Sequence, residues 1–182
     1  CVKTFNLALG GQLNRAHLTF RMLAEGAFAK LDGLYLAPGG SHIDNVTEVL
    51  HLAPHTSSAQ LYKGILEGKS RAVFNGKITI VKDAQKVDAQ QLNKNLLLSR
   101  EAEVDSRPQL VIDANDVKCS HGATIGQLDE QELFYLQSRA IAKDDAQRML
   151  AKAFIGDVIG QVSGKALVKH LESTLETFGG RA

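Results

Sequence analysis

Hydrophobic residues recur at every second position through the first two thirds of the chain. Short alternating runs, such as Phe5, Leu7 and Leu9, follow one another from Cys1 to about Ile125. A period of two residues predicts β-strands, because successive side chains of a strand point to opposite faces of the sheet. Gly, Asn, Asp and Ser separate many of the runs, and no helix-length periodic segment interrupts them. This part of the chain is therefore predicted to be all β.

Two architectures fit such a series of short strands. In a sandwich of hairpins, Asn75-Gly76 would form a type I′ turn, whereas in a parallel β-helix each strand would be one face of a coil. The chain has 5% aromatic residues, no Trp and 3 Pro. This composition suits a narrow core of stacked aliphatic side chains, so the β-helix is favoured, although no strict repeat period is visible.

After Ile125 the hydrophobic spacing changes to that of helices. Asp129 with Glu132, and Asp144 with Gln147, are typical of capping boxes. Apolar residues then recur every three or four positions, which predicts amphipathic helices. The first of these stripes consists of Ala146, Met149, Leu150, Ala153, Phe154 and Val158. The second consists of Ala166, Leu167, Leu171, Leu175 and Phe178, in a helix expected to start at Ser163 and end at Gly179-Gly180. The chain is thus divided into a β part, residues 1–128, and a helical part, residues 129–182.

Charge and cysteine content narrow the functional classes. A formal net charge of +1, with scattered Lys and Arg, argues against a nucleic-acid partner. No segment has the ~18 consecutive apolar residues of a membrane-spanning helix. Two cysteines cannot build a disulfide framework, which favours a reducing compartment, by default the cytoplasm. The chain starts at Cys1, without Met and inside a strand-like run, so we expect it to be N-terminally truncated.

The densest candidate chemistry lies in the run Asp116–Thr124. Residues two apart in a strand share a face, so Cys119 and His121 would present a thiol and an imidazole side by side, which is ligand chemistry for iron or zinc. Two ligands do not close a site, because an iron–sulfur cluster takes about four. The alternative is structural: if Val117 points inward, Cys119 and His121 do too, as a buried thiol and a hydrogen-bonded imidazole.

Other candidate groups are weaker. His42, His51 and His55 match no zinc signature, and we interpret them as ordinary histidines. Cys119 and His121 lack a third group that would orient a nucleophile and its base, so no catalytic pair is predicted. Phe134, Tyr135 and Leu136 are three consecutive large apolar residues, more than one face of a helix can bury. One or two of them should be exposed or covered by a partner. Alternatively, their helix is wedged between the β core and the following helix.

Several stretches carry a resemblance to a known family. They are Val73–Ile78, Leu96–Ser99, Arg107–Ile112, Asp116–Gly126 and Asp129–Arg139. Over roughly residues 40–160 the chain resembles the SufB/SufD family of iron–sulfur cluster assembly proteins, and within it the D subunit. The run Lys-Cys-Ser-His-Gly-Ala-Thr, residues 118–124, is long and specific to that subunit. Two positions depart from the family pattern: Ala140 stands where Gly is usual, and Asn115 precedes Asp116 where two acids are usual.

The resemblance implies a right-handed parallel β-helix followed by a helical C-terminal domain. It also implies a non-enzymatic scaffold: a SufD-like chain pairs with a SufB subunit through the β-helices, and its helical domain holds the ABC-type ATPase SufC. The family's functional interface histidine falls on His121, with Cys119 beside it, so a transient cluster would be completed by ligands from the partner, with no cofactor held tightly by this chain alone. The ATPase-binding residues would be Leu133, Phe134, Tyr135, Leu136, Arg139, Met149 and Phe154.

Three alternatives remain open at this stage. One is a free-standing metal-binding protein. Another is a polysaccharide-cleaving enzyme on a β-helix, which the scarcity of aromatic platforms argues against. The last is a zinc-dependent hydrolase using His42, His51 and His55. The chain has no Walker motif, so no ATPase activity of its own is expected. A homodimer of the isolated chain, and a plastid in place of the cytoplasm, are also compatible with the resemblance.

Overall fold

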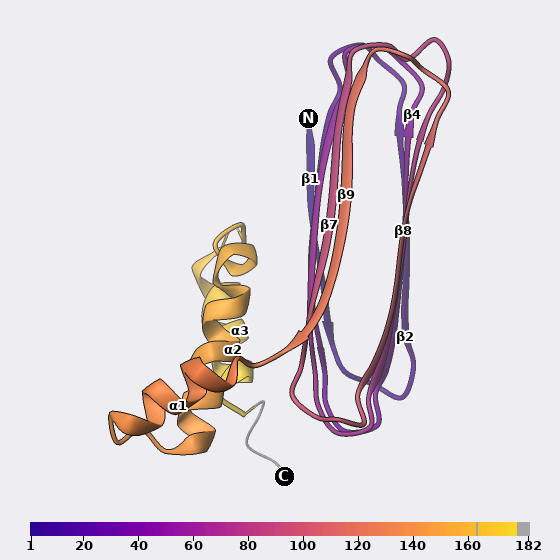
Figure 1. Cartoon of the computed structure of the whole chain (residues 1–182). Helices are drawn as coiled ribbons and strands as arrows, with labels where there is room; N and C mark the ends of the chain where they lie inside the picture. The colour runs from indigo at the N-terminus through magenta and orange to yellow at the C-terminus, as the bar shows by residue number, and fades with distance from the viewer. Residues whose placement is uncertain (163, 178–182) are drawn as a thin grey trace.

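A computed structural model describes residues 1–162 and 164–177 of the chain. Nine parallel strands alternate between two sheets that face each other along a flattened solenoid (Figure 1). One sheet, here called sheet A, has the order β1-β3-β5-β7-β9, and the other, sheet B, has the order β2-β4-β6-β8. The strands are β1 Val2–Leu9, β2 Asn14–Met22, β3 Phe28–Ala37, β4 His42–His51, β5 Ser57–Leu66, β6 Arg71–Ile80, β7 Val87–Leu97, β8 Glu103–Ile112 and β9 Val117–Gln127. The predicted parallel β-helix is confirmed.

Each strand pairs in register with the strand one full coil later. Val2 pairs with Ala29, 27 residues on, whereas Arg71 pairs with Glu103, 32 residues on. Coils of unequal length explain why the sequence shows no strict repeat. The strands are also longer, 8 to 11 residues, than the short apolar runs that predicted them, because polar residues continue each strand.

The hairpin alternative is wrong, because Asn75-Gly76 lies in the middle of β6. The glycine is needed there for space: a Cβ on Gly76 would lie 2.3 Å from Nε2 of Gln91, which reaches across the interior from β7. The glycine of this Asn-Gly pair is therefore required by packing inside the solenoid and not by a turn.

Two buried tyrosines fill the interior beside glycines. A Cβ on Gly64 would lie 2.1 Å from the ring of Tyr35, and one on Gly33 would lie 2.4 Å from the ring of Tyr62. In both cases the glycine is the partner of the tyrosine on the neighbouring rung. Asn93 donates a hydrogen bond to the Tyr35 hydroxyl at 3.1 Å, so the buried phenol is satisfied. The interior is thus a mixed apolar and polar stack.

Three helices follow the solenoid: α1 Glu130–Ser138, α2 Lys143–Ile159 and α3 Lys165–Thr177. Asp129 caps α1, its carboxylate accepting a hydrogen bond from the backbone N–H of Gln131 at 2.7 Å. The second predicted capping box is wrong, because α2 begins at Lys143 and has no side-chain cap, so Asp144 lies in its first turn. Within the described residues, no helix is long and apolar enough to span a bilayer.

The link between α1 and α2 contains a residue in the left-handed conformation. Ala140 has a positive φ of 62°. This conformation favours glycine, so the alanine is strained there.

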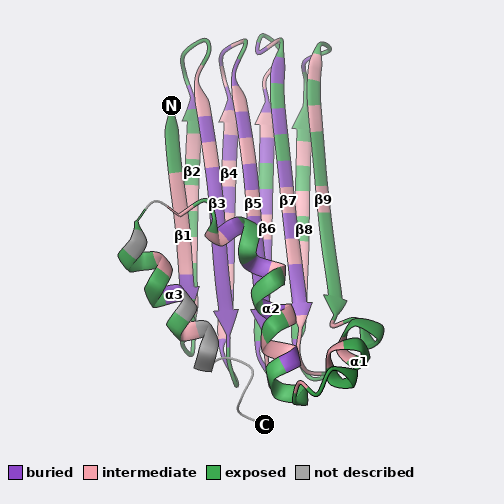
Figure 2. Ribbon diagram, turned by 90° about the vertical axis from the view of Figure 1, so that its left-hand side faces the viewer, coloured by how far each residue is buried: buried purple, intermediate pink, exposed green. Residues whose placement is uncertain are grey.

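Helix α2 packs on the outer face of sheet A (Figure 2). Its buried face consists of Ala146, Ala151, Ile155 and Val158. The predicted stripe is therefore wrong in part: Met149 and Ala153 are exposed. The predicted stripe was too wide because a helix packed on a sheet buries only the face that meets the strands. Leu171 of α3 joins the same hydrophobic cluster, whereas Ser163, Phe178 and Gly179-Gly180 lie outside the described residues.

A buried lysine fastens α2 to the sheet. Lys63 of β5 is 4% exposed, and its Nζ lies 2.6 Å from Oδ1 of Asp157. The same ammonium donates to the backbone carbonyl of Phe154 at 2.5 Å and lies 4.7 Å from the centre of that ring. Because a buried cation is costly unless it is paired, these contacts fix the position of α2 on the solenoid.

The tight packing at Gly64 gives a stability prediction. Gly64→Ala would drive a methyl group into the Tyr35 ring, and overpacking of this kind costs about 1–3 kcal/mol. Gly126→Ala is the control, because a Cβ there meets nothing within 4 Å. Chemical denaturation should show a lower free energy of unfolding for Gly64→Ala only. Equal stability of the two variants would contradict this description of the interior.

Candidate functional site

The last rung of the solenoid is open. Strand β9 ends sheet A and β8 ends sheet B, so each has a hydrogen-bonded neighbour on one side only. Among the described residues, no later strand covers them. Their burial reflects this: β7 alternates between buried and exposed positions, whereas most of β9 is exposed. Interior positions of the last rung are therefore accessible from the end of the solenoid.

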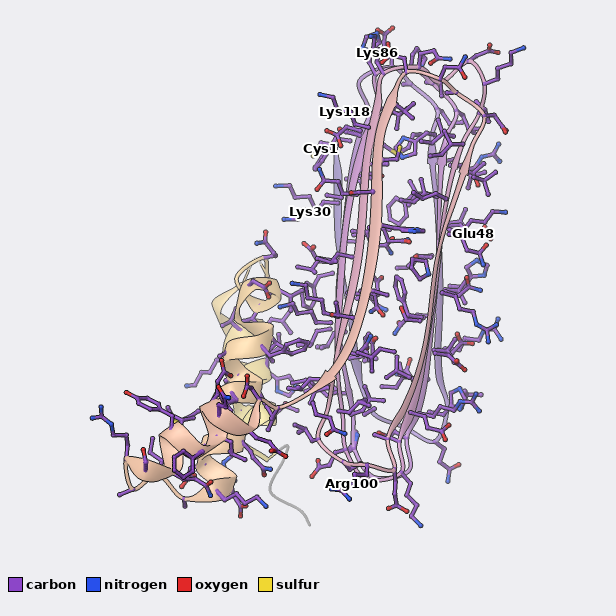
Figure 3. All side chains as sticks on the ribbon, in the orientation of Figure 1. Cys1, Lys30, Glu48, Lys86, Arg100 and Lys118 are labelled. Atoms are coloured by element: carbon purple, nitrogen blue, oxygen red, sulfur yellow. The ribbon has the colours of Figure 1, made fainter. Side chains whose placement is uncertain are left out.

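Cys119 and His121 occupy two such interior positions. Cys119 is the register partner of Ala89, and His121 that of Gln91, both of which are buried inside the solenoid. Lys118, adjacent to Cys119, points outward from sheet A (Figure 3). The two side chains thus share the inner face, about 6.6 Å apart along the strand. The two residues therefore lie on one face of β9, which is the placement that their spacing predicts.

The two residues differ in exposure. Cys119 is half-buried and packs against the core, whereas His121 is exposed. The structural alternative, with both side chains buried, is therefore wrong for His121. The difference arises because, among the described residues, no further rung covers this imidazole.

Burial raises the pKa of the Cys119 thiol, an effect opposed by a hydrogen bond with the Ala89 backbone. The thiol is consequently protonated at neutral pH and would become a ligand only when a metal displaces its proton. Imidazole and thiolate suit iron and iron–sulfur clusters. The described residues contain no group of three or more His, Cys, Asp or Glu that could hold a metal ion. Cys119 and His121 can therefore make only part of a site.

The three upstream histidines are not brought together. His42 and His51 lie at opposite ends of β4, about 30 Å apart for a strand of this length. His51 is fully buried, with its ring nitrogens 2.8 Å from Oγ1 of Thr56 and 3.0 Å from Oγ of Ser58. His55 is exposed in a turn. Nothing in this arrangement supports a zinc-dependent hydrolase.

A second surface lies on α1 and the start of α2. Phe134, Tyr135 and Met149 are exposed by 72%, 57% and 49%. Tyr135 also lines a groove of about 380 Å³ together with Gln131, Glu132, Leu136 and Leu150. We call this surface the α1–α2 patch, defined by the three exposed residues and the groove. Its apolar area is large for a short helix in contact with solvent.

The other predicted ATPase-binding residues take different positions. Arg139 is exposed, and its guanidinium lies 5.3 Å from the centre of the Tyr135 ring and donates to the tyrosine hydroxyl. Leu133 and Leu136 are half-buried. Phe154 packs on the hydrophobic cluster beneath α2, so it supports the helix and does not line the patch.

Sequence reasoning missed Gln91, which is 2% exposed and next to His121 in the register. A glutamine in a strand normally indicates a solvent-facing position. Gln91 lies at a spacing of two residues from Ala89 and four from Val87, so it shares a strand face with these two apolar residues. This shared face was the signal in the sequence that Gln91 points inward.

Sequence reasoning also missed a groove of about 340 Å³ on the outer face of sheet A, near Asp32 and Gln161. Burial raises the pKa of Asp32, opposed by the nearby Lys30 ammonium. The Nζ of Lys30 lies 3.6 Å from this carboxylate and donates to Gln161 at 2.5 Å. Lys30, Asp32 and Gln161 lie far apart in the sequence, so no local motif indicated them, although Ser120, His121 and Gly122 of the candidate run also line the groove.

Comparison with known proteins agrees with this geometry. Residues 1–154 match the family described as SUF system FeS cluster assembly, SufBD core domain. The chain is 41% identical over 163 residues to the iron–sulfur cluster assembly protein SufD of Escherichia coli, covering 90% of this chain and 38% of that protein. It is 38% identical over 160 residues to a SufBD family protein of Synechocystis, covering 88% of this chain and 35% of that protein. The chloroplastic protein ABCI7 of Arabidopsis thaliana is 36% identical over 154 residues, covering 84% and 32%.

The chain therefore belongs to the SufBD core family of SUF-system iron–sulfur cluster assembly proteins. It spans a little over a third of the length of the first two of these relatives.

Buried His51 gives a pH prediction. Burial lowers its pKa to about 4 from the ordinary 6.5. The imidazole therefore binds a proton more readily in the unfolded chain than in the folded one. The contribution of neutral His51 to the free energy of unfolding is fully present above pH 6.5 and is lost as the pH falls from 6.5 to about 4. Below about pH 4 this residue causes no further loss. A shift of this size corresponds to about 3 kcal/mol.

The test compares denaturation of the chain with that of His51→Gln at pH 7 and pH 4.5. The loss of stability on acidification should be smaller in the variant. Exposed His55 serves as the control, because His55→Gln should leave the loss unchanged. An equal loss in all three proteins would contradict a buried neutral imidazole.

Proposed function

We propose that this chain is a non-enzymatic scaffold subunit of the Suf complex, on which a nascent iron–sulfur cluster forms at an interface with a second subunit. The observation that carries the proposal is the open rung: a SufBD-family chain presents an imidazole and a thiol on one face, at the uncovered end of its solenoid. The two groups are too few for a cluster, and His121 is too exposed for a purely structural role. Both facts are explained if a partner completes the site.

The partner proposed for the open end is a SufB subunit. The outer edge of β9 has backbone N–H and C=O groups free of sheet pairing, and such an edge readily accepts a strand from another chain. Exposed Val111, Ile112 and Ile125 add apolar area on β8 and β9. In the absence of SufB, the same edge would allow two copies of this chain to pair.

His121 and Cys119 would bind the cluster from this side of the interface. The raised pKa keeps the Cys119 thiol protonated until a bound iron displaces the proton. The His121 side chain is exposed and accessible to iron without any such step. A site shared in this way would hold its cluster transiently, because separating the subunits removes the remaining ligands. The cluster is thus the cargo of the complex.

The α1–α2 patch is the proposed docking surface for the ABC-type ATPase SufC. Exposed aromatic residues beside an apolar groove are typical anchors for a protein partner. The Lys63–Asp157 pair and the shared hydrophobic cluster fix α2 to sheet A, so a movement of the bound ATPase would act on the solenoid directly. The compartment would be the cytoplasm of a bacterium, or a plastid.

Cluster formation should depend on His121. His121→Ala is expected to abolish cluster formation by the assembled complex while the chain still folds, because the imidazole is exposed. Cluster formation would be followed by absorbance after anaerobic reconstitution. His17→Ala is the control, since His17 is half exposed on β2 in the other sheet. Full cluster yield from His121→Ala would contradict the proposal.

ATPase binding should depend on Phe134. Replacing this exposed ring by Ser is expected to weaken binding of the ATPase at least tenfold in titration calorimetry, since interface aromatic anchors typically contribute about 2 kcal/mol or more. Leu23→Ser is the matched control, because Leu23 is 69% exposed but lies before β3, away from the helices. Equal loss in both variants, or no loss in either, would place the ATPase elsewhere.

A further inference from the structure

Two side-chain amides, those of Gln60 and Gln91, form a row of hydrogen bonds in the interior of the solenoid that leads towards the open rung. Nε2 of Gln60 donates a hydrogen bond to Oγ1 of Thr47 at 2.7 Å, and Nε2 of Gln91 donates to Oε1 of Gln60 at 2.7 Å. Gln60 on β5 and Gln91 on β7 are register partners, and both are buried. The hydrogen bond between them has a direction: the later rung donates and the earlier rung accepts.

The row ends on an acceptor without a donor. Oε1 of Gln91 is buried, and the described part of the chain gives it no hydrogen-bond partner. An unsatisfied buried carbonyl costs about 1–3 kcal/mol. One rung further, the register partner of Gln91 is His121, on a strand about 4.8 Å away. If the hydrogen bond from Gln91 to Gln60 is repeated one rung later, His121 is the donor and Gln91 is the acceptor.

We propose that the imidazole of His121 donates a ring N–H to Oε1 of Gln91, and that Gln91 is thereby a positioning residue for His121. The hydrogen bond fixes which ring nitrogen carries the proton. The other nitrogen then keeps its lone pair free, away from the interior and towards the open end. Histidines that bind metals are commonly oriented by such a second hydrogen bond. The value of this arrangement for cluster assembly rests on the proposed function above, whereas the hydrogen bond itself does not.

The surroundings suit Gln91 to this role. Its amide group lies against Gly76, where a Cβ would come within 2.3 Å of Nε2, so the side chain has little freedom to turn away. An amide also does not titrate, so its carbonyl stays an acceptor at every pH, unlike a carboxylate. Nε2 donates to Gln60, whereas Oε1 has no partner among the described residues, so Oε1 is the acceptor that this amide offers to His121.

The tautomer of His121 tests the proposal. Long-range ¹H–¹⁵N correlation spectra of the chain with ¹⁵N-labelled histidine, recorded at pH 8 and assigned with His121→Ala, report which ring nitrogen is protonated. We expect a single tautomer in the unmodified chain and a mixture in Gln91→Met, which keeps the side-chain length but lacks the acceptor. Gln90→Met is the matched control, because Gln90 is exposed on the opposite face of β7.

Two results would overturn the hydrogen bond: a mixture of tautomers in the unmodified chain, or a tautomer that Gln91→Met leaves unchanged. The first needs no variant, so it applies even if Gln91→Met fails to fold.

Cluster yield separates this proposal from the proposed function. Loss of an orienting partner typically costs 10–100-fold in metal affinity or activity, so Gln91→Met should lower the yield at least tenfold. A changed tautomer with undiminished yield would overturn the positioning role. If instead His121→Ala leaves the yield intact, the proposed function fails, while the hydrogen bond is still judged by the tautomer alone.

Discussion

The structure depends on one constraint: each strand from β1 to β7 is paired in register with the strand one coil later, so its interior side chains are covered by the next rung. The constraint buries Gln60 and Gln91 in the middle of the solenoid. At β9 it can no longer be met, because the chain turns away into α1. An imidazole that would be buried on any earlier rung is exposed on this one. The same chain geometry that builds the core therefore creates the candidate site, without a dedicated loop or cleft.

The second consequence of the coil concerns the outer face of sheet A. Outward positions of β3, β5 and β7 carry Leu34, Leu36, Ile65 and Leu96, and α2 covers them. The buried Lys63 ties the helix to β5 through Asp157 and the backbone of Phe154. The α1–α2 patch is thus connected to sheet A, which ends in the open rung, through the packing of α2 on the strands.

Much of this arrangement follows from the sequence. The period of two predicted the strands, and the low aromatic content favoured the coil over the sandwich. The shared parity of Cys119 and His121 placed them on one face. What the sequence concealed were interior residues of unexpected type: Gln60, Gln91 and Gly76 are residues typical of exposed or turn positions. Only the register shows that they face inward, because the identity of a residue's neighbour one coil away is a long-range property. The buried face of α2 was missed for the same reason.

The central claim is that His121 contributes a ligand to a cluster shared between two subunits. The most direct measurement is pulsed electron paramagnetic resonance of the reconstituted complex with a reduced cluster, in which only this chain carries ¹⁵N-labelled histidine. We expect a ¹⁵N hyperfine coupling of the size given by a directly bound imidazole, and its loss in His121→Ala. A cluster that forms with no ¹⁵N coupling from this chain would contradict the account.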